Sequence, residues 1–412
     1  MKGFFEKDKT ELPYKSEQGY HSCASCGLYK YTLTPRMKPY GNFQKGIMVV
    51  GEAPGEDEDK KGKPWQGKMG RALQYKYRQL GIDLFEDCVS LNAVNCRPVD
   101  KKGNNRPPTE FEISCCRQKV MDAIKRYKPK VIILQGGVAV SSLIGHRWKR
   151  GGLGGIMKWR GWTIPDRDYQ AWVCPTFHPS FVERQEEENE AEVIWTGDLK
   201  QAFTKVKEPF PKYRNEEDCI VVTNDIEGVM KQFLKQGPTP FMAFDIETTG
   251  LKPYNKTSHK IVSISFCNNE QEAYAIPFPE EKRHLKLLKQ LLEHPRIGKI
   301  AANIKFEDNW LNVLCGIEVN PWVFDTMQAS HILDNRPGIT SVKFQAYVRF
   351  GILGYDEFVQ PYLKSPDSNT PNRIKELTED KESFRKLQIY NGMDSLIEYR
   401  LAMLQMKEIG MA

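Results

Sequence analysis

The hydrophobic positions of the chain fall into short apolar runs separated by longer amphipathic stretches. In the first half, the runs "GIMVV", "CVSLNAV", "KVIILQGG" and "AWVCPTF" alternate with segments such as "GRALQYKYRQLG" and "EISCCRQKVMDAIKRY". Short apolar runs that alternate with helical patterns are typical of an α/β layer with a parallel sheet. We therefore predict an α/β domain whose strands and helices lie within residues 46–206.

A second α/β pattern follows the Pro-rich, charged segment "KEPFPKYRNEED", which we interpret as a linker. "CIVVT", "FMAFDIETTG" and "KIVSISFCNN" predict strands, "EGVMKQFLKQ" predicts a helix after the first of them, and the remainder from residue 282 has mainly helical patterns. The acidic run "ERQEEENEAE" at 183–192 is interpreted as a solvated helix face. The predicted organisation is a first domain over 1–207, a linker over 208–217 and a second domain over 218–412.

Length and composition agree with two globular domains. The chain has 412 residues, 40% of them hydrophobic, and a formal net charge of +7, which permits a polyanionic partner without requiring one. It has no apolar run of about 18 residues, and its start, "MKGFFEKDKT", lacks a signal-peptide apolar stretch. We expect a soluble, cytoplasmic protein with no membrane contact, in which the ten cysteines form no disulfide framework.

Three segments of the second half carry acidic residues at informative positions. Asp245 and Glu247 lie two apart at the end of an apolar strand, so both carboxylates point to one face. "NIKFEDNWL" adds Glu307 and Asp308, and "YNGMDSLIEYRL" adds Asp394 four residues after Tyr390, on the same helical face. Four carboxylates gathered in this way can hold two Mg²⁺ ions about 4 Å apart, the arrangement used to cleave phosphodiesters.

In this order, the three segments resemble the proofreading 3′–5′ exonuclease domain of family A DNA polymerases, as does "FDTMQASHILD" at 324–334. The resemblance covers about 218–405 and implies a ribonuclease H-like fold that binds single-stranded DNA and 3′ ends. It implies Asp245, Glu247, Glu307 and Asp394 as ligands of two Mg²⁺ or Mn²⁺ ions, with Tyr390 orienting the attacking water. Glu307 has the spacing from Asn303 at which the family normally has Asp. The neighbouring Asp308 points about 100° away on a helix, so only one of the two can face the metal ions, and we favour Glu307 as the ligand.

The stretch "GEAPGEDED" in the first half does not match a phosphate-binding loop. Glu52 places a carboxylate at the strand tip, and Pro54 removes a backbone donor that such a loop would use. Downstream come "GKPWQGKMGRAL", "LNAVNCRP", "NRPPTEFEISCC" and "CPTFHPSF". This order resembles family 4 uracil-DNA glycosylases, the iron–sulfur type, over about residues 20–205. It implies an α/β/α domain with a parallel sheet.

The glycosylase resemblance also implies roles for individual residues. Trp65 replaces the usual Phe that stacks on a flipped base, Asn92 reads the polar edge of uracil, and His178 binds the departing uracil anion. Glu52 positions or activates water, while backbone at Ala53 and Gly55 shapes the same pocket. The sequence leaves two alternatives open. The first half could be an inactive, glycosylase-like module that only binds DNA or docks a polymerase. If it is active, its substrate could be a modified pyrimidine instead of uracil.

Cysteines at family positions imply a [4Fe–4S] cluster. The ligands would be Cys23, Cys26, Cys96 and Cys116, with Cys115 as the less favoured neighbour of Cys116. The same four thiolates could hold tetrahedral zinc, and the resemblance is what favours iron–sulfur.

Fusion of these two domains resembles the N-terminal part of certain bacteriophage DNA polymerases. In those chains a polymerase domain follows the exonuclease, whereas 18 residues follow Asp394 here. The sequence therefore indicates either a fragment or a natural subunit that works with a separate polymerase chain, in the cytoplasm of a bacterial host if it is encoded by a phage.

Overall fold

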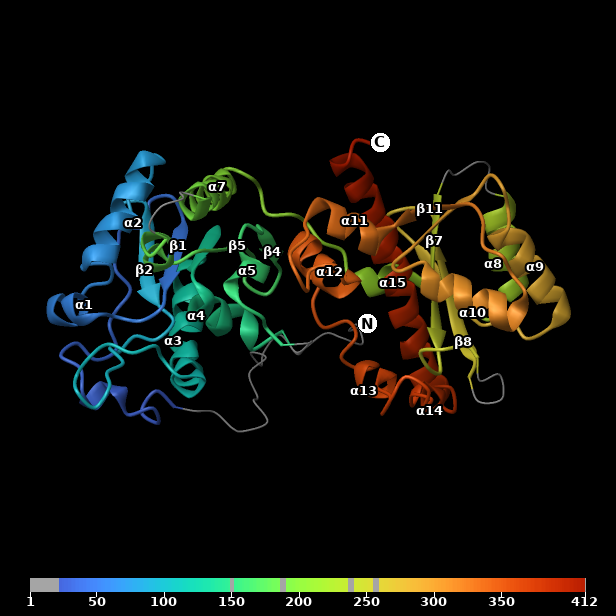
Figure 1. Ribbon diagram of the computed structural model, residues 1–412, viewed down its shortest axis with the longest axis horizontal. Helices are drawn as coiled ribbons and strands as arrows, with labels where there is room; N and C mark the ends of the chain where they lie inside the picture. The colour runs from blue at the N-terminus through green and yellow to red at the C-terminus, as the bar shows by residue number, and fades with distance from the viewer. Residues whose placement is uncertain (1–21, 149–151, 186–189, 236–240, 255–258, 412) are drawn as a thin grey trace. The chain divides into compact units, whose positions relative to one another are not determined.

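The computed structural model describes residues 22–148, 152–185, 190–235, 241–254 and 259–411. These residues form two compact units. The N-terminal unit comprises the described residues up to Lys212 together with Tyr347–Ile352, and the C-terminal unit comprises Tyr213–Ala346 and the residues from Leu353 onward. Figure 1 traces the chain through both units, from blue to red.

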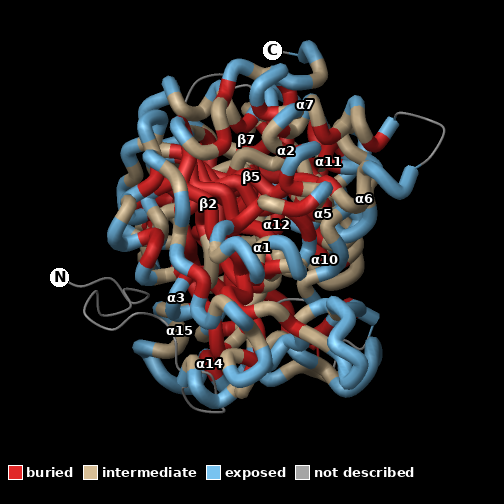
Figure 2. Tube along the Cα trace, turned by 90° about the vertical axis from the view of Figure 1, so that its left-hand side faces the viewer, coloured by how far each residue is buried: buried red, intermediate tan, exposed pale blue. Residues whose placement is uncertain are grey.

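The N-terminal unit contains a five-stranded sheet in the order β2-β1-β3-β5-β4. Its strands are β1 (Ile47–Gly51), β2 (Cys88–Asn92), β3 (Val131–Gln135), β4 (Ile164–Asp166) and β5 (Ala171–Thr176). The first, second, third and fifth are mutually parallel, and β4 pairs antiparallel with β5 at the edge. Every residue of these strands is buried, as β2 and β5 show in red in Figure 2, which explains why they read as continuous apolar runs.

Helices cover this sheet. They are α1 (Glu56–Lys61), α2 (Lys68–Gln79), α3 (Glu110–Tyr127), α4 (Gly137–Val140), α5 (Ile156–Trp159), α6 (Pro179–Glu183) and α7 (Glu190–Thr204). Leu73 and Tyr77 of α2 pack with Trp195 and Leu199 of α7 in one core cluster that includes inward side chains of β1, β3 and β5. Residues 186–189 of the predicted acidic helix face lie outside the described residues.

The C-terminal unit contains a six-stranded mixed sheet in the order β11-β10-β7-β8-β9-β6. Its strands are β6 (Ile220–Val222), β7 (Phe241–Thr248), β8 (Ile261–Cys267), β9 (Ala273–Pro277), β10 (Gly298–Ala301) and β11 (Trp322–Asp325). β7, β8 and β9 form an antiparallel meander, and the other pairings are parallel.

The helices of this unit divide between the two faces of the sheet. They are α8 (Ile226–Lys235), α9 (Lys282–Leu292), α10 (Lys305–Cys315), α11 (Thr326–Leu333), α12 (Val342–Phe350), α13 (Gln360–Leu363), α14 (Ile374–Leu377) and α15 (Lys381–Glu408). α8, α9 and α10 share one core cluster with the sheet. The long α15 packs across β6, β7, β8, β9 and β10. Among the described residues, no helix combines the length and the apolar character that crossing a membrane requires.

Alternation along β7 decides which side chains meet α15. Met242, Phe244 and Ile246 belong to the cluster shared with α8, α9 and α10, so Asp245 and Glu247 point to the opposite face. On β8, the small side chains of Ser263 and Ser265 face α15. Ser263 donates to the Asn391 side-chain oxygen and Ser265 to the Asn391 carbonyl, each at 2.8 Å. Small residues and these hydrogen bonds hold α15 close to the strand that carries the two acids.

The predicted α/β fold of both halves is confirmed, and the ten sequence patterns quoted above match strands or helices of the structure. Four strands of three to five residues, β4, β9, β10 and β11, were missed, because runs this short carry only a weak periodic signal. The stretch from residue 282 is therefore not only helical, because β10 and β11 extend the sheet beside β7.

Candidate active sites

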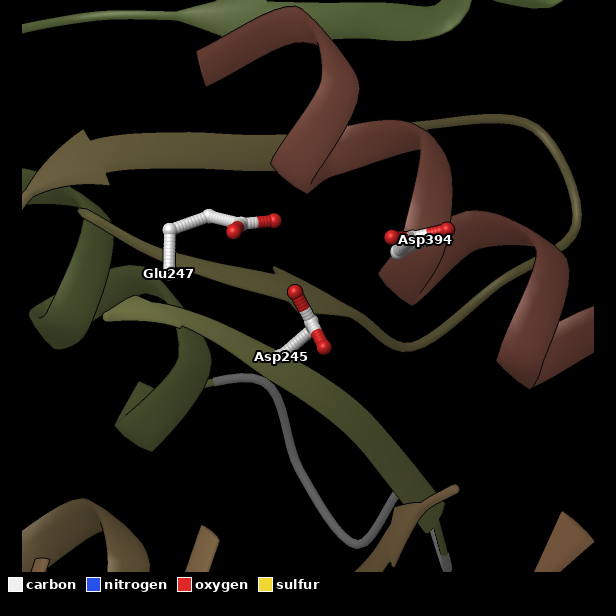
Figure 3. Close-up of side chains that lie close together, drawn as sticks. All are labelled: Asp245, Glu247 and Asp394. Atoms are coloured by element: carbon white, nitrogen blue, oxygen red, sulfur yellow. The ribbon is translucent and has the colours of Figure 1, made fainter. Parts of the chain in front are cut away.

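Asp245, Glu247 and Asp394 bring three carboxylates together in the C-terminal unit. One oxygen from each lies within 4.8 Å of the others. Figure 3 shows Asp245 and Glu247 on strand β7 and Asp394 on the facing helix α15, with the carboxyl groups pointing into a shared space. Burial raises the pKa of Asp245, and repulsion from Asp394 raises it further. Burial likewise raises the pKa of Glu247. Such a cluster is costly without cations, as expected of a metal site.

Two side chains that the sequence reasoning missed hold Asp394 in place. The Lys343 ammonium forms an ion pair with Asp394 Oδ1, and the Tyr355 hydroxyl donates to the same oxygen at 2.5 Å. Lys343 also lies 4.7 Å from the ring centre of Tyr390. Neither residue belongs to a motif around Asp394, because they lie 51 and 39 positions away in the sequence. Only the tertiary fold brings them to the site.

Glu307 and Asp308 face different surroundings at the start of α10. Glu307 is 4% exposed; burial raises its pKa, and repulsion from Asp245 adds to the effect. Asp308 is half-buried and accepts a hydrogen bond from Trp322 Nε1 at 3.3 Å. Glu307 does not belong to the group of three carboxylates within 4.8 Å.

Tyr390 lies one turn before Asp394 on α15 and is buried. Its ring stacks on that of Tyr355, with centroids 5.9 Å apart. Burial raises the pKa of the Tyr390 phenol, so the hydroxyl keeps its proton at neutral pH. The structure therefore places a neutral hydroxyl beside the carboxylates.

In the N-terminal unit, the predicted residues gather where parallel strands end. Gly51 ends β1, Asn92 ends β2, and the two are paired in register, while His178 follows β5 by two residues. A Cβ on Gly51 would lie 2.4 Å from Asn92 Oδ1 and 2.8 Å from Trp65 Cζ2. Only glycine leaves room for both side chains. Ligands of open α/β sheets bind at such carboxyl ends.

Trp65 is held in an unusual backbone conformation. Its φ is 58°, which a bulky residue adopts only where the surroundings enforce it. A Cβ on Gly70 would lie 2.1 Å from the Trp65 carbonyl, and Gln74 Nε2 donates to that carbonyl at 3.0 Å. The ring centre of Trp65 lies 5.6 Å from that of His178, and the buried indole N–H has no hydrogen-bond partner among the described residues.

Hydrogen bonds of His178 determine its tautomer. The backbone N–H of Ser180 donates to His178 Nδ1 at 3.2 Å, so Nδ1 is an acceptor and the ring proton of the neutral form is on Nε2. Burial lowers the pKa of His178 to about 4, and the positive charge of Arg184 acts in the same direction. At neutral pH this ring is therefore an uncharged donor through Nε2.

The loop after β1 holds the remaining predicted residues. Burial raises the pKa of Glu52, and Arg184, which the sequence reasoning did not single out, opposes that shift. The side chain of Ala53 packs against the core cluster that contains Cys96 and Cys116. The Gly55 amide donates to Glu58 Oε2 at 3.1 Å, and the other Glu58 oxygen accepts from two further amides. Glu58 thereby fixes this loop.

Cysteines from three distant segments lie together near this loop. Cys96, Cys116 and, at its edge, Cys26 belong to one core cluster. Burial raises the pKa of Cys96, and it raises the pKa of Cys116 to about 12; the charges of Cys23 and Cys26 act in the same direction on both. The Arg36 amide donates to Cys96 Sγ at 3.2 Å, an interaction of the kind that tunes iron–sulfur clusters.

Comparison with known proteins divides the chain at the same place. Residues 38–200 match the uracil DNA glycosylase superfamily, and residues 220–404 match a 3′–5′ exonuclease family. A type-4 uracil-DNA glycosylase of Thermotoga maritima is 36% identical over 185 residues, 45% of this chain and 90% of that protein. A solved structure of Brucella melitensis NrnC with bound Mg²⁺ has 18% identity and a TM-score of 0.30, and covers 43% of this chain and 79% of its own.

One relative spans both units. A DNA polymerase of Bacillus phage SP01 is 25% identical over 397 residues, which are 89% of this chain and 40% of that polymerase. The chain thus spans less than half the length of this relative. With the glycosylase match in its N-terminal half and the exonuclease match in its C-terminal half, the chain belongs to the type-4 uracil-DNA glycosylase family and carries, fused to that domain, a 3′–5′ exonuclease domain.

Proposed function

We propose that the chain is a bifunctional DNA enzyme that removes uracil with its N-terminal unit and trims 3′ ends with its C-terminal unit. The observation that carries the proposal is the group of three carboxylates, the half-buried Asp245 and the buried Glu247 and Asp394, whose oxygens lie within 4.8 Å of one another. Among the described residues, these three acids outnumber the one cation that pairs with them, Lys343, as is expected where metal ions bind.

The donor set of the exonuclease site fits hard divalent cations. Carboxylate oxygens are the ligands that Mg²⁺ and Mn²⁺ prefer, and no sulfur or imidazole belongs to the group. Asp245, Glu247 and Asp394 would hold one ion, and Glu307 would help to hold a second. When bound, such ions supply an activated water and stabilise the departing 3′ oxygen. The neutral Tyr390 hydroxyl would orient that water by hydrogen bonding.

The proposed glycosylase chemistry uses groups of the protein alone. The Asn92 amide offers one donor and one acceptor to the edge of a flipped base, and the Trp65 ring offers a stacking surface. The His178 Nε2–H would donate to the uracil anion as the N-glycosidic bond breaks. The Glu52 carboxylate would favour the cationic sugar and position the water that adds to it.

We further propose a [4Fe–4S] cluster on Cys23, Cys26, Cys96 and Cys116. Cys116 is favoured over Cys115 because Cys116 belongs to the core cluster that contains Cys96 and packs against Cys26, and Cys115 is not part of that cluster. A bound cluster would keep these thiols deprotonated despite burial. Iron, sulfide and zinc analysis of anaerobically purified chain distinguishes a cluster from a zinc site.

DNA is the proposed substrate of both units, as single strands and as frayed 3′ ends that reach the carboxylates. A DNA polymerase chain or domain is the proposed partner, since the phage relative is a polymerase. The second candidate function is an exonuclease whose N-terminal unit only binds DNA or docks that polymerase. Asn92, His178 and Glu52 all lie at the carboxyl ends of the parallel strands, and this arrangement favours the active enzyme.

Removal of divalent ions tests the two activities in one sample. In brief EDTA treatment, 3′ trimming of uracil-containing single-stranded DNA should stop, since its nucleophile depends on bound ions. Uracil release should continue and leave abasic sites that hot alkali cleaves. D245A should lose trimming without EDTA, and H178A should show the opposite pattern, with trimming intact and base release greatly weakened.

Contrary outcomes separate the candidates. EDTA-treated chain that leaves uracil DNA intact, under conditions where a known glycosylase acts, would favour the docking module. Trimming by D245A at the wild-type rate would refute the exonuclease site.

A further inference from the structure

Asn391 is a buried polar residue of α15 to which the proposed chemistry gives no role. It follows Tyr390 directly, lies three residues before Asp394 and is 0% exposed. Burying an amide costs free energy unless its donors and acceptors are bonded. The partners of the Asn391 side chain therefore indicate what it does.

The amide nitrogen of Asn391 is bonded to Asp245, one of the three clustered carboxylates. Nδ2 donates to Asp245 Oδ2 at 2.7 Å and to the Asp245 backbone carbonyl at 3.1 Å. Because both acceptors belong to the same residue of β7, the two bonds fix the carboxyl group relative to its own backbone. A carboxylate that is held in this way does not have to be ordered by the cation that it binds.

Ser263 on β8 determines which way this amide faces. Its hydroxyl donates to Asn391 Oδ1 at 2.8 Å, an oxygen that can only accept. With Oδ1 directed to Ser263, Nδ2 is directed to Asp245. The same hydroxyl also lies 3.2 Å from the Ile276 carbonyl oxygen, which is an alternative acceptor. Ser263, Asn391 and Asp245 thus form a series of hydrogen bonds that ends at the carboxylate.

Ser265, two residues further along β8, makes a bond to Asn391 that serves attachment alone. Its hydroxyl donates to the Asn391 backbone carbonyl, also at 2.8 Å. Any residue at position 391 offers that carbonyl, so this bond attaches α15 to β8 without the amide. The side-chain bonds to Ser263 and Asp245 come in addition, and packing alone would be served as well by an apolar residue of the same shape.

We infer that Asn391 is a positioning residue of the exonuclease site and that Ser263 acts through it. The two residues order the Asp245 carboxylate before a cation arrives. This inference rests on the proposed exonuclease function and deepens it, because a residue outside the carboxylate group then sets how tightly Asp245 binds a cation. Residues that are hydrogen-bonded to metal ligands typically change metal affinity by about 10–100-fold.

Binding of Mn²⁺ by S263A and S265A tests the inference with a matched pair and without any activity measurement. Each variant removes one buried hydroxyl that donates to Asn391 at 2.8 Å, but only S263A releases the amide. In calorimetric titration of the full chain, S263A should bind Mn²⁺ about tenfold more weakly than wild type. S265A should bind it as wild type does. Thermal melting without metal identifies a temperature at which both variants are folded.

N391L removes the amide itself. Leucine has the branched skeleton of asparagine, and Ser263 can turn to the Ile276 carbonyl. Its Mn²⁺ affinity should fall by about 10–100-fold. Q405M is the control, because Gln405 is a buried amide of the same helix that donates to the Thr326 carbonyl and to Ser330 Oγ instead of an acid. Q405M should bind Mn²⁺ with wild-type affinity.

Four results would overturn the inference or its basis. Equal Mn²⁺ affinity of S263A and S265A would exclude Ser263 from positioning Asp245. Wild-type affinity of N391L would show that Asn391 only attaches α15 to the sheet. A loss of affinity in Q405M as large as that in N391L would assign the effect to the stability of α15. Equal Mn²⁺ binding by wild type and D245N would instead contradict the proposed exonuclease site itself.

Discussion

Glu307 and Asp308 are neighbours in the sequence, yet one is buried near Asp245 and the other is bonded to Trp322. We predict that E307A lowers exonuclease activity by at least about 100-fold, since even residues around metal ligands contribute about 10–100-fold. D308A should keep activity close to wild type and lose only the hydrogen bond to the indole. Rates of 3′ trimming at saturating Mg²⁺ measure the difference, and the reverse order of effects would assign the ligand to Asp308.

His178 allows a prediction about pH. Its pKa in the folded chain is lowered from the ordinary value of 6.5 to about 4, so the unfolded chain binds this proton more readily. The stability that His178 contributes is therefore complete above pH 6.5 and is lost as the pH falls toward 4. NMR of labelled histidine, assigned with H178N, should show an Nε2–H tautomer that does not titrate between pH 8 and 6. A titration centred near the ordinary value would contradict the buried site.

At the scale of elements, the contact between α15 and the sheet positions Asp394. Gly392 lies two residues before Asp394, and a Cβ there would lie 2.3 Å from Ile220 Cγ2 on β6. We predict that G392A destabilises the C-terminal unit by about 1–3 kcal/mol, the usual range for overpacking, and lowers exonuclease activity by shifting α15.

The double variant G392A/I220A checks that cause. Because I220A removes the colliding methyl, the double variant should be destabilised by less than the sum of the two single changes. Chemical denaturation of the C-terminal unit measures all three variants. Additive effects would mean that the collision with Ile220 is not responsible.

Elements with a clear periodic pattern of hydrophobic residues could be predicted from the sequence. Elements and side chains whose positions depend on tertiary contacts could not. The alternation of β7 predicted that Asp245 and Glu247 share a face, and the spacing of Tyr390 and Asp394 predicted one helical face. Lys343 and Tyr355 gave no local signal, because the path of the chain between α11 and α15 decides where they lie. β10 and β11 are four residues long and extend the sheet only because β7 pairs with β10.

At the scale of the whole molecule, the boundary between the units is not a single point in the sequence. Tyr347–Ile352, the end of α12 and the residues after it, belongs to the N-terminal unit although it follows most of the exonuclease motifs. The Tyr347 hydroxyl donates to Asp166 Oδ2 at 2.8 Å within that unit. Asp166 is also paired with Arg147. A piece of the chain that ends in the linker therefore lacks part of its own unit.

We predict that Y347F destabilises the N-terminal unit of the full chain by about 1.5–3 kcal/mol, the range for hydrogen bonds to charged groups. Urea unfolding followed by the signals of that unit measures the loss. Y75F is the control, because Tyr75 is 64% exposed in the same unit. Equal stability of Y347F and Y75F would show that this hydroxyl adds nothing to the unit.

The proposed base-binding residues are sensitive to any substitution of Gly51. Every other amino acid adds a Cβ at a place 2.4 Å from Asn92 Oδ1 and 2.8 Å from Trp65 Cζ2, so any replacement disturbs the residue that would read the base and the one that would stack on it. We expect one missense change at that codon to weaken base excision, while the exonuclease carboxylates lie on separate elements. If Asn92 and Trp65 act as proposed, a single substitution at Gly51 would leave an exonuclease whose N-terminal unit no longer excises bases. Survival of glycine at this position in natural variants becomes a simple genetic record of whether excision is still under selection.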